Sequence, residues 1–143
     1  MTPEEIFSLC NGLALLGWVV LIFIPSWKKR DQYVLNFIIM LFVIVYSWII
    51  FSSIDKNIFS NFSTLAGVSK LFADKTLLLA GWIHYLAFDL LAGIYIVRNA
   101  AKNGIHHWLT TPALFFTFLF GPFGLLLYFG LRWVKTRKFF SDF

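Results

Sequence analysis

The chain has 143 residues, of which 59% are apolar and only 13% are charged, and its formal net charge is +5. Because an ordinary soluble domain has about a quarter of its residues charged, this composition excludes a soluble globular domain, a disordered chain and a disulfide-stapled secreted domain. What remains is an integral membrane protein with no more than about five spans, whose lysines and arginines lie beside apolar segments and therefore indicate loop charges rather than a nucleic-acid partner.

Four long apolar runs follow one another along the chain. Residues 6–27, 33–54 and 108–131 contain no charged side chain, and residues 76–97 contain one acid, Asp89. A helix needs about 20 such residues to cross the ~30 Å of bilayer hydrocarbon, and continuous apolar runs favour helices over the alternating strands of a barrel. The sequence therefore predicts an all-α fold: a single transmembrane domain over residues 1–143, built as a polytopic bundle of four transmembrane helices.

The connections between these runs differ in kind. Residues 55–75 place apolar side chains at helix-like spacing between polar ones, which predicts a segment on the membrane surface; an ordered loop packed on the helix ends is the alternative. An even number of spans puts both termini on one side, and that side would carry seven lysines and arginines against five on the other. This excess favours cytoplasmic termini, whereas the basic turn at residues 28–30 favours the opposite orientation.

Asp89 is the most informative residue within the predicted spans, since it lies about 3 Å from the middle of its span. An ionised carboxylate at that depth costs a few kcal/mol, so Asp89 needs a partner, a water-filled cavity or a proton. A protonated carboxyl in an apolar pocket can act as a general acid, which makes Asp89 the first catalytic candidate. The alternative is a hydrogen bond that holds two helices together, for which Asn11 is the best candidate partner.

His84 and Tyr85 complete the candidate catalytic set. In a helix Tyr85 lies on the same face as Asp89, and His84 lies further round, so we expect all three to line one concave surface. A histidine exchanges protons near neutral pH; a hydrogen bond to a backbone carbonyl or to interfacial water is its alternative role. His106 and His107 add further metal-ligand types, but no two histidines lie three or four residues apart. We therefore expect no metal and no cofactor.

Gly121 and Pro122 interrupt the fourth apolar run near its centre. Proline removes a backbone hydrogen bond and kinks a helix, and carbonyl groups freed at membrane depth are tolerated only inside protein or along a cavity. The sequence therefore predicts a kinked fourth helix whose break faces the bundle interior. Together with these two residues, the candidates for substrate binding are Asn11, Trp18, Trp48, Trp82, Arg98, His107 and Thr117. Core packing, interhelical hydrogen bonds and interfacial anchoring are the alternative roles of these side chains.

Several motifs resemble those of one membrane protein family. Residues 81–93 read GWIHYLAFDLLAG, residues 104–108 read GIHHW, and residues 120–128 read FGPFGLLLY. In order and spacing, over roughly residues 62–133, they resemble the ABA4-like (abscisic acid-deficient 4-like) family. The matched positions are His84, Tyr85, Asp89, Arg98, His107 and the Gly121-Pro122 break. Plant members of that family are tied to the formation of neoxanthin from violaxanthin, an isomerisation of a carotenoid epoxide to an allene.

The resemblance implies a long, flat, apolar isoprenoid as the substrate. In such a reaction a protonated Asp89 would donate to the epoxide oxygen while a neutral His84 accepts the proton of the adjacent C–H group. The first hypothesis is therefore a membrane-embedded enzyme, isomerase-like, that modifies a carotenoid or other isoprenoid. The alternatives are a non-catalytic carotenoid- or lipid-binding membrane protein and a small proton-coupled transporter. We expect a bacterial inner membrane or a plastid-type membrane, contacts with membrane lipid, and either a homo-oligomer or a partner enzyme.

Overall fold

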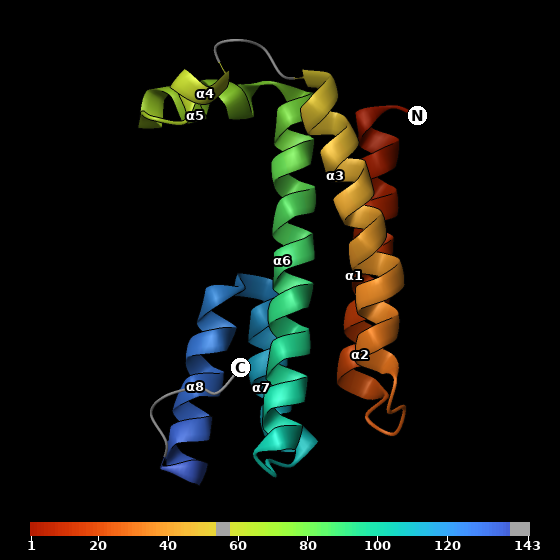
Figure 1. The fold of residues 1–143 in the computed structure, drawn as a ribbon, viewed down its shortest axis with the longest axis vertical. Coiled ribbons are helices and arrows are strands. Elements are labelled where there is room, and N and C mark those ends of the chain that lie inside the picture. Colours follow the sequence, from red (N-terminus) through yellow and green to blue (C-terminus); the bar gives the residue numbers. More distant parts are fainter. Residues whose placement is uncertain (54–57, 138–143) are drawn as a thin grey trace.

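The computed structural model describes residues 1–53 and 58–137, and this part of the chain is helical and has no strand (Figure 1). In chain order the elements are α1 (Pro3–Phe23), α2 (Arg30–Tyr33), the π-helix η1 (Val34–Ile39), α3 (Met40–Ser53), α4 (Ile58–Asn61), α5 (Leu65–Ala73), α6 (Lys75–Lys102), α7 (His107–Phe120) and α8 (Pro122–Thr136). Three stretches within the described residues are long and apolar enough to cross a membrane: Pro3–Phe23, Arg30–Ser53 and Lys75–Lys102. They confirm a helical protein built for a membrane.

The ends of the spanning helices follow local sequence signals. Thr2 and Glu5 form a capping box at the start of α1, in which each side chain accepts a hydrogen bond from the other residue's backbone N–H. The carboxylate of Asp74 accepts hydrogen bonds from the backbone N–H groups of Thr76 and Leu77 at the start of α6. The loop after α6 contains Gly104 at φ +66°, a backbone conformation that glycine adopts without steric cost.

The long helix α6 is the centre of the bundle, with α1 and α3 packed along it (Figure 1). Trp18 of α1 is 2% exposed and lies against Gly93 of α6, where an added Cβ would be 2.8 Å from the indole ring. Gly17 of α1 meets Leu90 of α6 in the same manner. Small residues at these contacts let helix backbones approach closely, which is how spanning helices associate when lipid offers an equally apolar environment.

The fourth predicted span is two helices and not one, which corrects the expected four-helix bundle. Helix α7 runs back along α6 and α8 returns beside it, so the two form a hairpin whose turn lies about halfway along α6 (Figure 1). Thr117 and Gly124 would be about 10 Å apart along the axis of one continuous helix, but here Gly124 lies directly against the Thr117 side chain. With 14 and 15 residues, neither helix is long enough to cross ~30 Å of hydrocarbon.

Gly121 makes this reversal possible. It lies between the two helices at φ +44° and ψ −95°, in the positive-φ region that residues with a Cβ rarely adopt. Pro122 follows as the first residue of α8, where its missing N–H costs no helical hydrogen bond. The expected kink of a single fourth helix is therefore replaced by a turn between two half-length helices. The break does face the protein interior, because Gly121 is buried against α6.

Helices α4 and α5 occupy part of the predicted surface segment. They lie at the same end of α6 as the N-terminus (Figure 1). The side chain of Phe72 packs against Gly81 of α6, while Leu65 is 87% exposed. Residues 54–57 of the segment lie outside the described residues. Its placement on a membrane surface stays a prediction.

The hairpin changes the expected orientation, since α1 starts at one end of α6 and α8 finishes at the other (Figure 1). Within the described residues, the end with Met1 carries Lys70 and Lys75. The opposite end carries Lys28, Lys29, Arg30, Arg98, Lys102, Arg132, Lys135 and Arg137. Cytoplasmic loops are rich in lysine and arginine, so we expect this second end to be cytoplasmic and the N-terminus to lie across the membrane from it.

Single-cysteine reporters check this orientation. Cys10 is buried and is replaced by serine, and Lys70→Cys and Lys102→Cys each provide one exposed thiol. A membrane-impermeant maleimide applied to intact cells is expected to label Lys70→Cys and to leave Lys102→Cys unlabelled until the membrane is opened. The reverse labelling, or labelling of both sites on intact cells, would contradict the charge-based orientation.

Candidate functional site

Asp89 lies at the middle of α6 and against the turn of the hairpin. Its side chain is 8% exposed, and a Cβ added to Gly121 would be 2.5 Å from its Oδ1 atom. Oδ2 is buried and has no hydrogen-bond partner among the described residues. Asp89 therefore lies beside the N-terminal end of α8, where the helix dipole favours negative charge. A buried acceptor without a partner is costly, and such an atom is a natural contact for a polar group of a bound molecule.

Tyr85 lies one helical turn before Asp89 and interacts with its carboxyl group. The hydroxyl of Tyr85 donates a hydrogen bond of 3.3 Å to the backbone carbonyl of Leu119, near the end of α7. This carbonyl belongs to the last turn of a helix, where carbonyl groups lack an intrahelical partner. Tyr85 thus ties α6 to the hairpin turn and stays beside the carboxyl group, as the sequence predicts for these two residues.

An apolar groove of about 390 Å³ opens beside Asp89, between α6 and α8. We call it the α6–α8 groove. Its walls include Phe88, Ala92 and Tyr95 from α6 and Pro122, Leu125 and Phe129 from α8. Phe88 is 58% exposed, so the groove faces the surroundings of the bundle, which in a membrane are lipid. The arrangement offers an apolar molecule a lateral entrance and a single carboxyl group on its floor.

His84 lies on a different face of α6 from Asp89. Its exposed ring is 4.4 Å from the ring of Phe88 and 5.7 Å from that of Tyr46 on α3, measured between centroids. It lines a second cavity, of about 210 Å³, between α3, α5 and α6. Of the three residues expected to line one concave surface, Asp89 lines the α6–α8 groove and His84 lines the second cavity, while Tyr85 lies beside Asp89 but is not among the residues that line the groove.

Several polar and aromatic substrate candidates lie outside the α6–α8 groove and make contacts of their own. Asn11 does not pair with Asp89 as expected; its side-chain carbonyl accepts a hydrogen bond of 3.0 Å from the indole N–H of Trp82. Trp18 is part of the core, with its ring 5.7 Å from that of Phe118. Trp48 is 65% exposed on α3, away from the groove. Their roles toward a substrate stay predictions.

Thr117 supports the close approach of the two hairpin helices. It is fully buried, and its hydroxyl donates a hydrogen bond of 2.8 Å to the backbone carbonyl of Ala113. Gly124 packs on both residues with no space for a side chain. Thr117 therefore contributes to the shape of the hairpin, as an interhelical contact of the kind that threonine commonly makes in membranes.

Arg98 and His107 lie at the basic end of the bundle, where they connect helix ends. Arg98 forms an ion pair of 2.5 Å with Asp31. The Nε2–H group of His107 donates to the carbonyl of Ile22 at 2.8 Å, which leaves Nδ1 to accept from the guanidinium of Arg30 at 3.2 Å. Burial, together with the nearby charge of Arg30, lowers the pKa of His107. A neutral ring fits both hydrogen bonds, since one nitrogen donates and the other accepts.

Tyr128 and Asn99 were not predicted, yet they fix α8 on α6. Both are buried, and the hydroxyl of Tyr128 donates a hydrogen bond of 2.7 Å to the side-chain oxygen of Asn99. With the contact between Asp89 and Gly121 this second link makes α6 and α8 run parallel. A tyrosine in the middle of α8 and an asparagine near the end of α6 give no signal in the sequence, because their pairing depends on the hairpin. Within the described residues no three histidine, cysteine or acidic side chains gather as a metal site would require.

Comparison with known proteins extends the resemblance to the ABA4-like family from the motifs to most of the chain. The model of a family described as ABA DEFICIENT 4-like matches residues 5–128, which include the first two spanning helices as well as Asp89 and the hairpin turn. No match was found among curated proteins or among solved structures. Since the family model covers well over half of the sequence, the chain belongs to the ABA4-like family.

Proposed function

We propose that the chain is a membrane-embedded enzyme that isomerises a carotenoid or related isoprenoid by acid/base chemistry at Asp89. One observation supports this most directly: a buried carboxyl group with an unpartnered oxygen lies on the floor of an apolar groove at the middle of a spanning helix. Because the groove opens sideways, it can receive a long polyene directly from the bilayer. The proposed substrate class is the one that the resemblance to the ABA4-like family implies.

The isomerisation of an epoxide balances without an oxidant or reductant. The protonated Asp89 carboxyl gives its proton to the epoxide oxygen, and the C–O bond breaks with its electron pair moving to the oxygen. The adjacent C–H group then loses its proton to the Asp89 carboxylate, and its electron pair forms the new double bond. Asp89 is thereby protonated again, so one residue serves as acid and as base. Phe88 and Phe129 flank the groove and would stabilise a carbocation by cation–π attraction.

Tyr85 and His84 take different places in this scheme. Tyr85 interacts with Asp89 and holds its carboxyl group against the hairpin turn, so we assign it a positioning role. His84, the base expected from the sequence, would reach only a substrate that passes over the ring of Phe88. A His84→Gln variant that keeps full turnover would therefore agree with Asp89 acting alone.

The test is a turnover assay with the purified chain. The protein in detergent or liposomes is incubated with a 5,6-epoxycarotenoid, and the carotenoids are separated by chromatography. The expected result is an isomer of unchanged mass in which a hydroxyl group and an allene replace the epoxide. Recovery of unchanged epoxycarotenoid bound to the protein would instead identify a binding protein, and proton-gradient-driven uptake without conversion would identify a transporter. Either outcome would overturn the proposed isomerase.

A further inference from the structure

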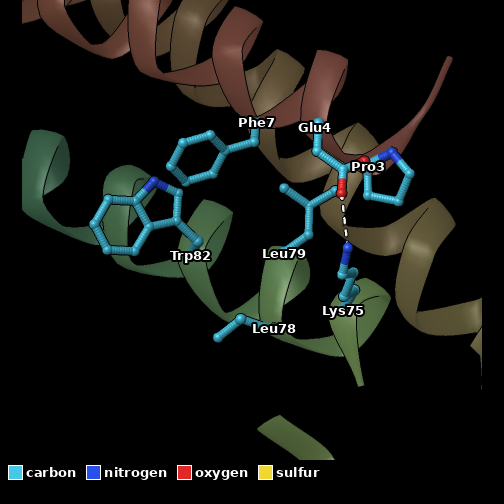
Figure 2. A pocket seen from close by; sticks show the side chains of 7 residues that line it. All are labelled: Pro3, Glu4, Phe7, Lys75, Leu78, Leu79 and Trp82. Atoms are coloured by element: carbon cyan, nitrogen blue, oxygen red, sulfur yellow. Dashed lines mark hydrogen bonds and ion pairs between the residues drawn. The ribbon is translucent and has the colours of Figure 1, made fainter. Parts of the chain in front are cut away.

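A second groove lies between the N-terminal halves of α1 and α6. We call it the α1–α6 groove; its volume is about 460 Å³, and it is lined mainly by Glu4, Phe7, Lys75, Leu78, Leu79 and Trp82 (Figure 2). Helix α7 occupies the space beside α1 and α6 in the lower half of the bundle only, because the hairpin turns back at the level of Asp89. In the upper half of the bundle no helix of the described residues lies in the corresponding position, and the α1–α6 groove occupies it.

The groove is polar at one end and apolar at the other. Glu4 and Lys75 form an ion pair of 3.1 Å at the end of the helices, and both side chains are well exposed (Figure 2). Further along, the rings of Phe7 and Trp82 lie 5.7 Å apart. An occupant with an apolar body and a hydrogen-bonding end group fits this division, with its end group at the membrane surface and its body in the hydrocarbon.

Aromatic contacts connect this groove with Asp89. The ring of Trp82 is 5.4 Å from that of Tyr85, and Tyr85 interacts with Asp89, which lines the α6–α8 groove. Steps of three and four residues keep Trp82, Tyr85 and Asp89 on one side of α6. The α6 residues that line the two grooves range from Lys75 to Trp82 and from Phe88 to Tyr95, so their outer ends lie 20 residues, or about 30 Å, apart along the helix. That length equals the hydrocarbon thickness of a bilayer.

We infer, on the basis of the proposed function, that the α1–α6 groove is a second subsite for the same rod-shaped molecule that reacts at Asp89. The reacting end of the isoprenoid lies in the α6–α8 groove. The polyene passes Tyr85 and Trp82, and the remote end group meets the Glu4–Lys75 pair at the membrane surface. The subsite selects substrates by length, because a shortened isoprenoid reaches Asp89 but leaves the α1–α6 groove empty.

Two probes of different length test this assignment. The long probe is a full-length epoxycarotenoid with hydroxylated end rings, and the short probe is a truncated apocarotenoid with the same epoxide ring and about half the chain. Two variants change the groove: Trp82→Ala removes a wall, and Leu78→Trp fills it from a position that is 49% exposed. Phe51→Ala, at 76% exposure on α3, is the matched aromatic control, since Phe51 lines neither groove. Binding is measured from the polyene absorption retained by the purified protein.

The wild type is expected to bind the long probe more tightly than the short one. Both groove variants should raise the Kd of the long probe about tenfold or more, since they remove or block apolar contact, and should change the Kd of the short probe less than about twofold. The control should change neither. Equal weakening of both probes, or no weakening of the long one, would overturn the second subsite.

These outcomes are separate from those of the turnover assay. If the long probe binds in a Trp82-dependent manner but no isomer forms, the subsite stands and the proposed isomerase fails. If both probes are converted and bind equally well to the wild type and to Leu78→Trp, the isomerase stands and the subsite is wrong.

Discussion

Replacing Asp89 by asparagine is expected to lower the turnover of an epoxycarotenoid by at least about 10³-fold while the protein stays folded. The side chain at position 89 has little space, because a Cβ added to Gly121 would lie only 2.5 Å from Oδ1 of Asp89. Asparagine fits this space because it has the same shape as aspartic acid. The amide of asparagine is too weak an acid to transfer a proton to an epoxide oxygen. General acid–base groups contribute about 10²–10⁴-fold to reaction rates. Since Asp89 serves twice in the proposed reaction, the loss belongs at the upper part of that range.

Binding and unfolding measured on the same variant separate catalysis from structure. The Kd of the epoxycarotenoid should change little, because an amide can still form a hydrogen bond with the oxygen of the substrate. Glu5→Gln is the matched control for loss of a carboxylate: a glutamine at this position still completes the capping box of α1, and normal turnover is expected. Normal turnover in Asp89→Asn would refute the acid role, and loss of folding in Asp89→Asn would support the interhelical hydrogen bond instead.

Hydropathy predicts the three spanning helices because each is a continuous apolar run whose ends carry charges or caps. It misplaces the fourth run because 24 apolar residues read the same whether they cross a bilayer or turn back halfway. The difference depends on Gly121 adopting φ +44° and on Gly124 packing against Thr117 without a side chain. A glycine at either position is also compatible with a continuous helix. The Gly-Pro sequence therefore indicates that the helix is interrupted, but it does not determine the direction that the chain takes afterwards.

The candidate site divides in the same way. Asp89 was predicted from the cost of its charge, and Tyr85 from helix periodicity, since both signals are local. The placement of His84 away from the α6–α8 groove depends on where α3 and α5 pack on α6. The hydrogen bond between Asn11 and Trp82 depends on which faces of α1 and α6 are in contact. Such contacts are tertiary, and helix periodicity alone does not determine which face meets which neighbour.

Replacing Gly121 by alanine is expected to destabilise the hairpin strongly. An alanine at φ +44° and ψ −95° has a conformational cost of about 1–3 kcal/mol, and its Cβ would lie 2.5 Å from Oδ1 of Asp89, a separation that non-bonded carbon and oxygen atoms do not reach. Together these effects should lower the free energy of unfolding by roughly 2–4 kcal/mol. Because the hairpin forms one wall of the α6–α8 groove, carotenoid binding and turnover should fall as well. Thermal unfolding in detergent measures the first effect.

The matched control is Gly130→Ala in the same helix α8. No atom lies within 4 Å of the Cβ position of Gly130, and alanine is favoured over glycine inside a helix by up to about 1 kcal/mol. This variant should therefore be as stable as the wild type or more stable. Equal effects of the two substitutions would mean that the turn at Gly121 does not have the described conformation.

A double-mutant cycle separates the two causes of the Gly121 effect. In an Asp89→Ala background the carboxyl group that an alanine at position 121 would meet is absent, while the backbone strain of a positive φ is unchanged. The destabilisation by Gly121→Ala should then shrink to the backbone strain alone, about 1–3 kcal/mol. An undiminished penalty would show that Asp89 and the hairpin turn are not in contact. The α6–α8 groove would then lack its carboxyl group, so this cycle tests the geometry on which the proposed chemistry depends, without requiring any substrate.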